Sequence, residues 1–310
     1  MNFPRLPIPG QRNSIQCRKP HRLQTCLARQ IDLALNTSEK AELLTQQIAS
    51  YQRCAVALSG GVDSAVVAKA AHLALRESAV AVTARSPSVP ASEIEEARRV
   101  AAEIGIRHEI VDTQETQNPL YIQNAPDRCF HCKTELYSQI ELLVAAIDAP
   151  LIINGANVDD QGDHRPGMIA AKNHQVRSPL IECGLTKADV RALAQHWNLS
   201  VHDKPASPCL ASRIAYGEEA TPERLAMIEA AEAFLRQQGL REFRVRYHRG
   251  DIARIEVTPE RIVPLATDPL RSELAKKLHE LGFRAVTLDL DGFRSGNLNN
   301  FVDLSAIRVE

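Results

Sequence analysis

Residues 59–64 read Ser59-Gly60-Gly61-Val62-Asp63-Ser64, and they follow a short apolar stretch and precede a longer one. Residues 54–58 are all apolar, and their number is typical of a buried strand. Residues 65–71 are rich in alanine and valine, which is typical of a helix packed on a sheet. The six residues are therefore predicted to form a tight turn between a strand and a helix.

The residues of this turn suit an anionic ligand. Paired glycines allow positive φ and leave no Cβ between the backbone amides and a ligand. The N–H groups at the start of the following helix favour an anion such as pyrophosphate. Ser59 and Ser64 add hydroxyl donors, and Asp63 can orient a bound magnesium ion or an amide. No Gly-Lys-Ser/Thr follows, which excludes a Walker A loop. An ordinary turn is the alternative, but six specified positions in this context argue against it.

The bulk composition limits the classes of function. A chain of 310 residues suggests about two domains, each with enough apolar residues for a core. Lysine and arginine number 37 against 38 acids, so no overall basic field gathers nucleic acid. No apolar run approaches the roughly 18 residues that a membrane span needs. We therefore expect neither a membrane nor a nucleic acid as a partner.

Residues 1–36 differ in composition from the rest of the chain. The first 31 residues contain six lysines and arginines, no acid, and prolines at positions 4, 7, 9 and 20. A transit segment or sequence upstream of the true start is an alternative, but the prolines argue against an amphipathic transit helix. We predict a disordered basic extension without a catalytic role, and a cytoplasmic location for the body of the protein.

From residue 37 onward, predicted helices and strands alternate. The helices cover residues 38–51, 92–104, 134–147 and 186–197, and the strands lie near residues 79–83, 108–111 and 151–154. The last of these helices opens with Thr186 as a cap and Asp189 three residues on. This alternation predicts an α/β domain over residues 37–214, with a mostly parallel, doubly wound sheet covered on both faces. Ligands of such sheets bind beyond the carboxyl ends of the strands, where residues 59–64 lie.

The pattern changes after residue 215. A helix over 222–238 precedes a hairpin of strands at 243–248 and 252–257, and a helix over 270–281 precedes a strand at 285–290. This order predicts a smaller C-terminal α+β domain over residues 215–310, with a role in substrate binding or oligomerisation.

The cysteines favour metal binding or catalysis over disulfides. Seven cysteines, an odd number, are widely spaced in a long chain without a secretion signal. Cys129 and Cys132 form a CxxC motif, which we place in a loop before a helix whose N-terminus would lower their pKa. Half of a zinc site, a redox pair and a pair of cluster ligands all remain open for this motif.

Cys209 is the third candidate. Pro205 and Pro208 fix the backbone around it, and Lys204 and Arg213 are nearby cations that would favour a thiolate. The alternative for a lone cysteine is a small buried hydrophobic residue. We assign that alternative to the remaining four, Cys17, Cys26, Cys54 and Cys183.

Asp163 and Arg165 follow the strand predicted at residues 151–154, which places them at the ligand-binding edge of the sheet. We regard them as candidate ligand-binding residues. A solvated loop is the alternative, because loops favour these residue types.

Arg244, Arg246 and His248 alternate on one side of a predicted strand, and apolar residues occupy the other side. Two or three cations on one strand face suit a phosphate or a carboxylate. A solvated strand face is the alternative.

Together and in this order, the motifs resemble the LarE-type ATP-dependent sacrificial sulfur transferases, a family of ATP pyrophosphatases. The resemblance covers about residues 40–300 and rests on SGGVDS at 59–64, RCFHCK at 128–133, GDHRPG at 162–167, PCLASR at 208–213, FRVR at 243–246 and LDLDGFRSG at 288–296. The first motif belongs to the whole superfamily, and the later ones are far more specific. Residues 1–36 have no counterpart.

The resemblance implies a PP-loop fold, ATP with Mg²⁺, and a homo-oligomer. It implies a small nucleotide-like carboxylate as substrate, a pyridinium dicarboxylate mononucleotide of nickel-pincer cofactor biosynthesis. Asp63 and Cys209 are the implied catalytic residues. The implied ATP ligands are Ser59, Gly60, Gly61, Asp63 and Ser64, and the implied ligands of the substrate phosphate are Arg213, Arg244 and Arg246.

Two mechanisms occur in this family. In one, the cysteine that matches Cys209 forms a thioester and gives up its own sulfur, leaving dehydroalanine. In the other, three cysteines hold a [4Fe-4S] cluster whose open iron carries an extra sulfide. Because Cys129, Cys132 and Cys209 are all present, and three thiolates leave one iron free, we favour the cluster.

Three other functions compete with this reading. A tRNA thiolation enzyme shares the loop, but the neutral net charge and 4% aromatic residues offer little support, and only the basic extension favours it. An amidotransferase-type synthetase would use ammonia and need no cysteine. A sensor of nucleotide or of an iron–sulfur cluster would bind without turnover.

Overall fold

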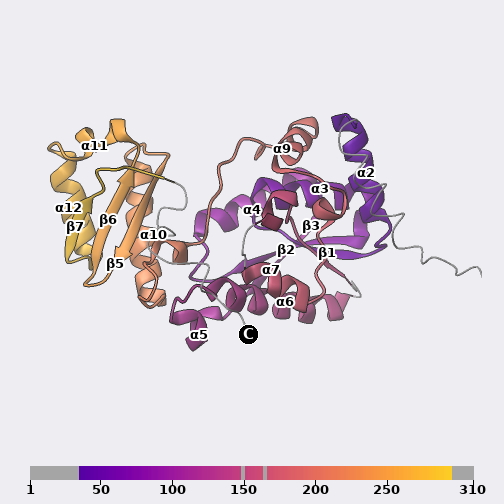
Figure 1. Cartoon of the computed structure of the whole chain (residues 1–310), viewed down its shortest axis with the longest axis horizontal. Coiled ribbons are helices and arrows are strands. Elements are labelled where there is room, and N and C mark those ends of the chain that lie inside the picture. Colours follow the sequence, from indigo (N-terminus) through magenta and orange to yellow (C-terminus); the bar gives the residue numbers. More distant parts are fainter. Residues whose placement is uncertain (1–34, 148–150, 163–165, 295–310) are drawn as a thin grey trace, which may run out of the picture. The chain divides into compact units, whose positions relative to one another are not determined.

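The first sheet has four parallel strands. The computed structural model describes residues 35–147, 151–162 and 166–294 (Figure 1). Within these described residues, the four strands of the first sheet lie in the order β3-β2-β1-β4. The strands are β1 Cys54–Ala57, β2 Ala79–Arg85, β3 Arg107–Asp112 and β4 Ile152–Ile153. The chain runs outward from β1 to β3 and returns to add β4 on the other side of β1, with Ala55 opposite both Val80 and Ile152. This reversal at β1 produces a switch point of the kind where α/β sheets bind ligands.

Helices cover both faces of this sheet, because its strands are apolar on both faces. Cys54 and Val56 of β1 pack into one core with α2 Thr37–Ala49, α3 Val62–Leu75, α4 Ala91–Ile104 and α9 Lys187–His196. Ala55, between them, packs into a second core on the opposite face, together with α6 Arg128–Ile147 and α7 Pro166–Asn173. Figure 1 shows the two helical layers. The predicted α/β class with a doubly wound parallel sheet is therefore confirmed.

Local sequence signals set several helix ends. Asn36 caps α2 through its side chain, and Glu39 completes the capping box. Thr186 and Asp189 form the same motif at the start of α9, as the sequence predicts. Helix α4 ends at Gly105, whose φ of +81° is in the left-handed region that glycine adopts easily.

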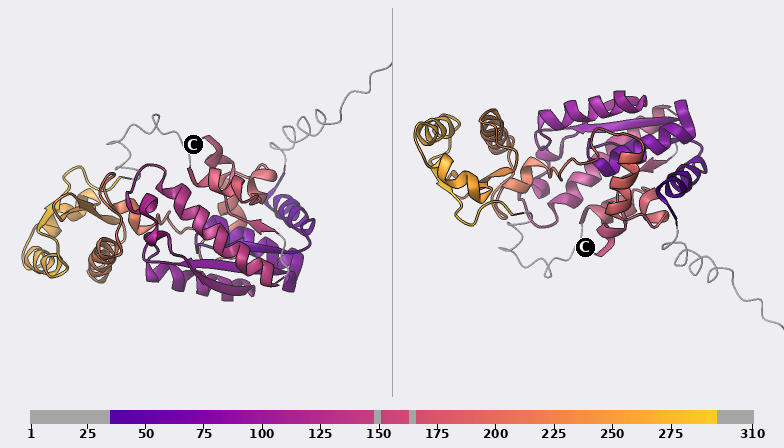
Figure 2. Two further views of the ribbon diagram at one scale, coloured as in Figure 1. Left: turned by 90° about the horizontal axis from the view of Figure 1, so that it is seen from below. Right: turned by 90° about the horizontal axis from the view of Figure 1, so that it is seen from above.

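A second sheet follows, with three strands in the described part of the chain. It contains β5 Phe243–His248, β6 Ile252–Val257 and β7 Ala285–Leu288, with β5 antiparallel and β7 parallel to β6. Phe243, Val245 and Tyr247 pack into a core with α10 Pro222–Gln237 and α12 Leu270–Glu280. Both views of Figure 2 show these two helices on the same side of the sheet. The hairpin strands have the predicted bounds, and residues 215–310 as a domain of their own remain a prediction.

Short elements complete the described chain. They are η1 Arg76–Ser78, η2 Glu115–Gln117, α5 Pro119–Ile122, η3 Val158–Gly162, α8 Pro179–Glu182, η4 Leu210–Arg213 and α11 Pro259–Leu265. Among the described residues, no helix combines the length and the apolar composition that crossing a membrane would require. The predicted disordered extension falls almost entirely on residues 1–34, which lie outside the described ranges.

Candidate functional site

The loop at residues 59–64 joins β1 to α3. Gly60 has a φ of +75°, and a Cβ there would lie 3.1 Å from the backbone nitrogen of Ala97, so glycine fits on both grounds. Gly61 is the N-cap of α3 and offers no side chain. The Ser59 amide donates to the Ser64 hydroxyl at 3.1 Å, and the Ser64 hydroxyl donates to the Gly61 carbonyl at 3.0 Å. These two hydrogen bonds close the loop at the N-terminus of α3. The positive end of the helix dipole at this position favours an anion.

Gly155, which follows β4, lies against this helix start. A Cβ on Gly155 would lie 2.7 Å from the Ser64 backbone nitrogen and 2.8 Å from the Asp63 carbonyl carbon. Both are backbone atoms in the first turn of α3, so neither can move away easily. Gly155 therefore sets how closely β4 approaches the nucleotide loop.

We expect Gly155→Ala to destabilise the fold by about 1–3 kcal/mol through overpacking, measured by urea unfolding. The same change should weaken ATP binding, because it displaces the start of α3. Gly217→Asn is the control, because a side chain at Gly217 meets nothing within 4 Å and asparagine tolerates its φ of +82°. An unfolding midpoint in Gly155→Ala equal to that of the control would contradict the close approach.

Asp63 is held by two side chains from distant segments. Its Oδ2 accepts a hydrogen bond from the ammonium of Lys187, and its Oδ1 accepts from the Asn157 amide at 3.1 Å. The predicted role of Asp63 in orienting a bound magnesium ion or an amide stays a prediction. Lys187 was not predicted from the sequence, although its place directly after the Thr186 cap put it at a helix start near the ligand edge.

The CxxC motif lies in the first turns of α6. The sequence placed it in a loop and began the helix at residue 134, which is wrong because α6 begins at Arg128. The Arg128 guanidinium is buried, donates to Asn124 Oδ1 and to the Ala211 carbonyl, and so joins the motif to the segment after Cys209. The Asn124 amide reinforces this link by donating to the Ala215 carbonyl at 2.9 Å.

The predicted lowering of the thiol pKa is wrong for Cys132. Burial raises the pKa of Cys132, and Glu115, Cys209 and Cys129 raise it further, while Lys133 opposes them. Burial therefore outweighs the helix N-terminus at this thiol.

The three candidate cysteines meet in one region. Burial lowers the pKa of Lys133, but Tyr137 and all three cysteines together raise it above its ordinary value. Cys132 and Cys209 also pack against the same apolar cluster around Leu210. Among the described residues, no three His, Cys, Asp or Glu side chains lie close enough to hold one metal ion. A four-iron cluster is larger than a single ion, so its ligands stand farther apart.

Two buried polar atoms beside these cysteines lack partners. The Tyr121 hydroxyl and Glu115 Oε2 have no hydrogen-bond partner in the described part of the chain, although both residues are at most 2% exposed. Burial raises the pKa of Tyr121, and the charges of Cys209 and Cys132 raise it further, so its ring lies beside both. Unpaired buried polar atoms are rare and favour an additional group nearby. The donor set and these atoms fit a cluster held by three thiolates.

Two of the three candidate phosphate-binding arginines are engaged in buried ion pairs. Arg213 is 2% exposed and contacts Glu232 at 3.0 Å. Arg246 contacts Glu256 at 2.8 Å. Each of these two arginines therefore contributes an ion pair to the fold. Phosphate binding by Arg213 and Arg246 stays a prediction. Arg213 also donates to the Cys209 carbonyl at 3.0 Å, which holds the cysteine in place.

Arg244 differs from its two neighbours. Within the described residues it contacts no carboxylate; its guanidinium lies over the Phe293 ring at 5.0 Å and donates to the Phe243 carbonyl. Burial lowers the pKa of Arg244 to about 10, and the charges of Arg213 and Arg246 add to this effect. A half-buried cation beside two others favours the arrival of an anion.

Asp163 and Arg165 lie outside the described residues, so their predicted ligand binding stays a prediction. Residues 158–162 before them form a short 3₁₀ helix. Asp159 accepts from the Lys187 backbone amide at 2.8 Å, which brings this segment next to the start of α9.

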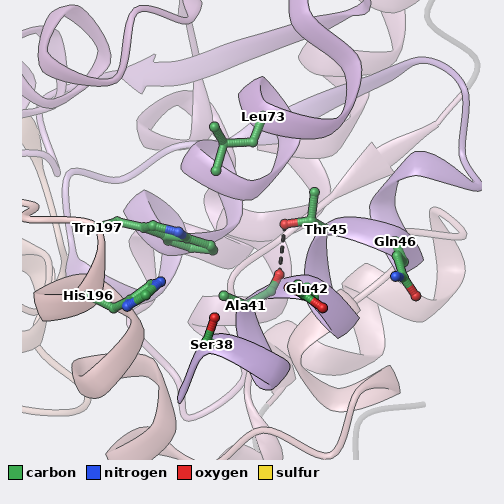
Figure 3. A pocket seen from close by; sticks show the side chains of 8 residues that line it. All are labelled: Ser38, Ala41, Glu42, Thr45, Gln46, Leu73, His196 and Trp197. Carbon is green, nitrogen blue, oxygen red and sulfur yellow. Dashed lines mark hydrogen bonds between the residues drawn. The ribbon is translucent and has the colours of Figure 1, made fainter. Parts of the chain in front are cut away.

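A hollow on the surface of the first core lies away from these residues. It has a volume of about 390 Å³ and is lined by Ser38, Ala41, Glu42, Thr45, Gln46, Leu73, His196 and Trp197 (Figure 3). These residues come from α2, α3 and the end of α9, and none is a candidate site residue. The position of this hollow therefore does not coincide with the candidate active site.

Comparison with known proteins identifies relatives along most of the chain. The family described as asparagine synthase matches residues 41–138, which include the nucleotide loop. An uncharacterised protein of Synechocystis sp. is 45% identical over 84% of this chain and 97% of its own length. Pyridinium-3,5-bisthiocarboxylic acid mononucleotide synthase of Lactiplantibacillus plantarum is 36% identical over 86% of this chain and 96% of its own length.

A third relative is similar over a shorter region. The tRNA-specific 2-thiouridylase MnmA of Anaplasma marginale is 28% identical over 53% of this chain and 52% of its own length. The two relatives with near-complete coverage therefore carry more weight for the whole chain.

Proposed function

The chain belongs to the LarE-type family of ATP-dependent sulfur transferases, and from this we propose that it converts a carboxylate of pyridinium-3,5-biscarboxylic acid mononucleotide into a thiocarboxylate. The observation that carries the proposal is that Cys129, Cys132 and Cys209 share one region, where all three raise the pKa of Lys133. The Leu210 amide donates to the Ser88 carbonyl just beyond β2, so the Cys209 segment lies at the carboxyl edge of the sheet. The nucleotide loop leaves β1 at that same edge.

The first step activates the carboxylate. A carboxylate is a poor electrophile, because oxide or hydroxide would have to leave. Attack of its oxygen on the α-phosphorus of ATP forms an acyl adenylate and releases pyrophosphate. Gly60, Gly61, Ser59 and Ser64 surround the position that the phosphates would take, and Lys187 supplies a cation for the leaving pyrophosphate. Asp63 provides the carboxylate that a nucleotide-bound Mg²⁺ would use.

The second step transfers sulfur. A sulfur nucleophile attacks the acyl carbon, the carbon–sulfur bond forms, and AMP leaves with the bonding electrons. Cys129, Cys132 and Cys209 would hold a [4Fe-4S] cluster, which when bound supplies an iron with an open position for the sulfide that is transferred. Arg128 places the CxxC motif beside the Cys209 segment, and its charge offsets part of the thiolate charge.

Iron and labile sulfide per chain test the cluster directly. We expect about four of each in anaerobically purified protein, because three thiolates suffice to hold such a cluster. A Cys209→Ala control should lose most of both. Protein without iron, even after anaerobic reconstitution, would contradict the cluster. Cys209 would then be a single-use sulfur donor, and dehydroalanine in its peptide after one turnover would identify that mechanism.

Arg244 is the cation that we assign to the substrate phosphate. Because it contacts no carboxylate within the described residues, an incoming phosphate would be its first anionic partner. We expect Arg244→Gln to raise the KM for the mononucleotide about 10- to 100-fold, equivalent to one charged hydrogen bond of about 1.5–3 kcal/mol. Arg249→Gln, at an exposed position just beyond β5, is the control and should leave KM unchanged. An unchanged KM in Arg244→Gln would place the phosphate elsewhere.

We further propose a cytoplasmic location and a homo-oligomeric state. Reduced thiols and an iron–sulfur cluster suit a reducing compartment. The oligomeric state is read from light scattering of the full chain.

A further inference from the structure

Lys204 begins the segment that carries Cys209, and its side chain contacts the nucleotide loop. Its ammonium donates to the Gly60 carbonyl at 3.0 Å and to Glu93 Oε2 at 2.7 Å. The side chains of Lys204 and Glu93 are 18% and 20% exposed, so this ion pair is largely shielded from water. The contact joins residues that are far apart in the sequence.

The Gly60 carbonyl controls the direction of one loop amide. A carbonyl and the N–H of the next residue belong to the same planar unit and point in opposite directions across a trans peptide. A donor that fixes the Gly60 carbonyl therefore also fixes the Gly61 N–H. That N–H is a weakly engaged donor, with the Ser59 hydroxyl 3.4 Å away. Lys204 thus fixes the orientation of the Gly61 N–H through the carbonyl at the other end of the same peptide unit.

The segment from Lys204 to Cys209 has an anchor at each end. Residues 205–208 are exposed and include two prolines, whose φ angles are fixed. At the far end, Arg213 donates to the Cys209 carbonyl and is itself held by Glu232. Five residues span at most about 18 Å, so the two anchors confine Cys209 to the vicinity of the nucleotide loop.

We propose that Lys204 is a positioning residue that couples ATP binding at the nucleotide loop to the ordering of the segment that carries Cys209. This role rests on the proposed sulfur transfer. A phosphate on the Gly61 amide favours the peptide orientation that Lys204 also favours, so nucleotide strengthens the Lys204 contact. By reciprocity, the Lys204 contact strengthens nucleotide binding by the same factor.

The test compares hydrogen–deuterium exchange of residues 203–212 with and without Mg·ATP, in the full chain as purified and without the carboxylate substrate. We expect saturating Mg·ATP to slow exchange of this segment about 5-fold or more in the wild type, the lower range of typical coupling energies. Lys204→Met should bind Mg·ATP more weakly by titration calorimetry and show no such slowing at saturation. Lys204→Arg retains a donor and should restore part of the effect.

Lys40→Met is the matched control. Lys40 forms an ion pair of the same length with Asp189, and both side chains are 18% exposed, but this pair joins α2 to α9 instead of the nucleotide loop. Its loss should cost similar stability and leave the ATP-dependent slowing intact. Equal slowing in Lys204→Met and in the wild type would overturn the coupling alone. Failure of the wild type to bind Mg·ATP would overturn both the coupling and the proposed sulfur transfer.

Discussion

Replacing Cys209 by alanine is expected to abolish sulfur transfer while ATP-dependent release of pyrophosphate continues. Both mechanisms of the family need this thiol, either as a cluster ligand or as the donor itself. The nucleotide loop, in contrast, is built from residues 59–64, Lys187 and Asn157, and none of these contacts involves the Cys209 side chain. The thiocarboxylate product is measured by mass spectrometry and pyrophosphate by a coupled assay.

A cysteine outside the site provides the control for this result. Cys183 is a partly buried free cysteine that packs against the first core and carries no predicted role. Cys183→Ala should keep both activities close to those of the wild type. Product formation by Cys209→Ala when ammonium is supplied would instead indicate a synthetase that uses ammonia, and would contradict sulfur transfer.

Glu232→Ala is expected to destabilise the fold by about 3–5 kcal/mol, because it removes the carboxylate that balances the buried Arg213 charge. Glu232 is 1% exposed, contacts Arg213 through both carboxylate oxygens, and accepts from the Val245 amide at 3.3 Å. The loss is measured as the change in the free energy of unfolding in urea. Since Arg213 also holds the Cys209 carbonyl, the variant should lose sulfur transfer at temperatures where it remains folded.

Two variants separate charge from packing in this experiment. Glu280→Ala removes an acid whose distance to Lys277 is 4.0 Å at an exposed position, and should change stability by less than about 0.5 kcal/mol. Arg213→Met combined with Glu232→Leu removes both charges and should recover part of the loss. A cost below about 1 kcal/mol for Glu232→Ala would mean that water compensates the Arg213 charge.

The sequence predicts those parts of the fold that depend on near neighbours. The nucleotide turn, the capping box of Thr186 and Asp189, and the bounds of β5 and β6 all follow from local patterns, and the structure agrees with each. The start of α6 was predicted too late, because two cysteines and a histidine hide the helical pattern of residues 128–133.

Contacts between distant segments were not predictable in the same way. Lys187 and Lys204 reach the nucleotide loop from segments more than a hundred residues away, and no short motif marks either residue. Arg246 alternates with Arg244 as an exposed cation would, yet it is buried against Glu256 on the neighbouring strand. The sequence pattern gives the face of a strand, but only the fold determines which cation on that face contacts a carboxylate of the described residues.

The position of β4 has a consequence for how the protein acquires its activity. This strand has two residues and pairs with β1 through Ala55 and Ile152. In the sequence, β2, β3 and α6 all lie between these two paired residues. Contacts between such distant residues carry a large loop-closure entropy and tend to form late in folding. Gly155 closes against the nucleotide loop only when β4 has docked. We therefore expect the ability to bind ATP to appear in the last phase of refolding, after the helices have formed.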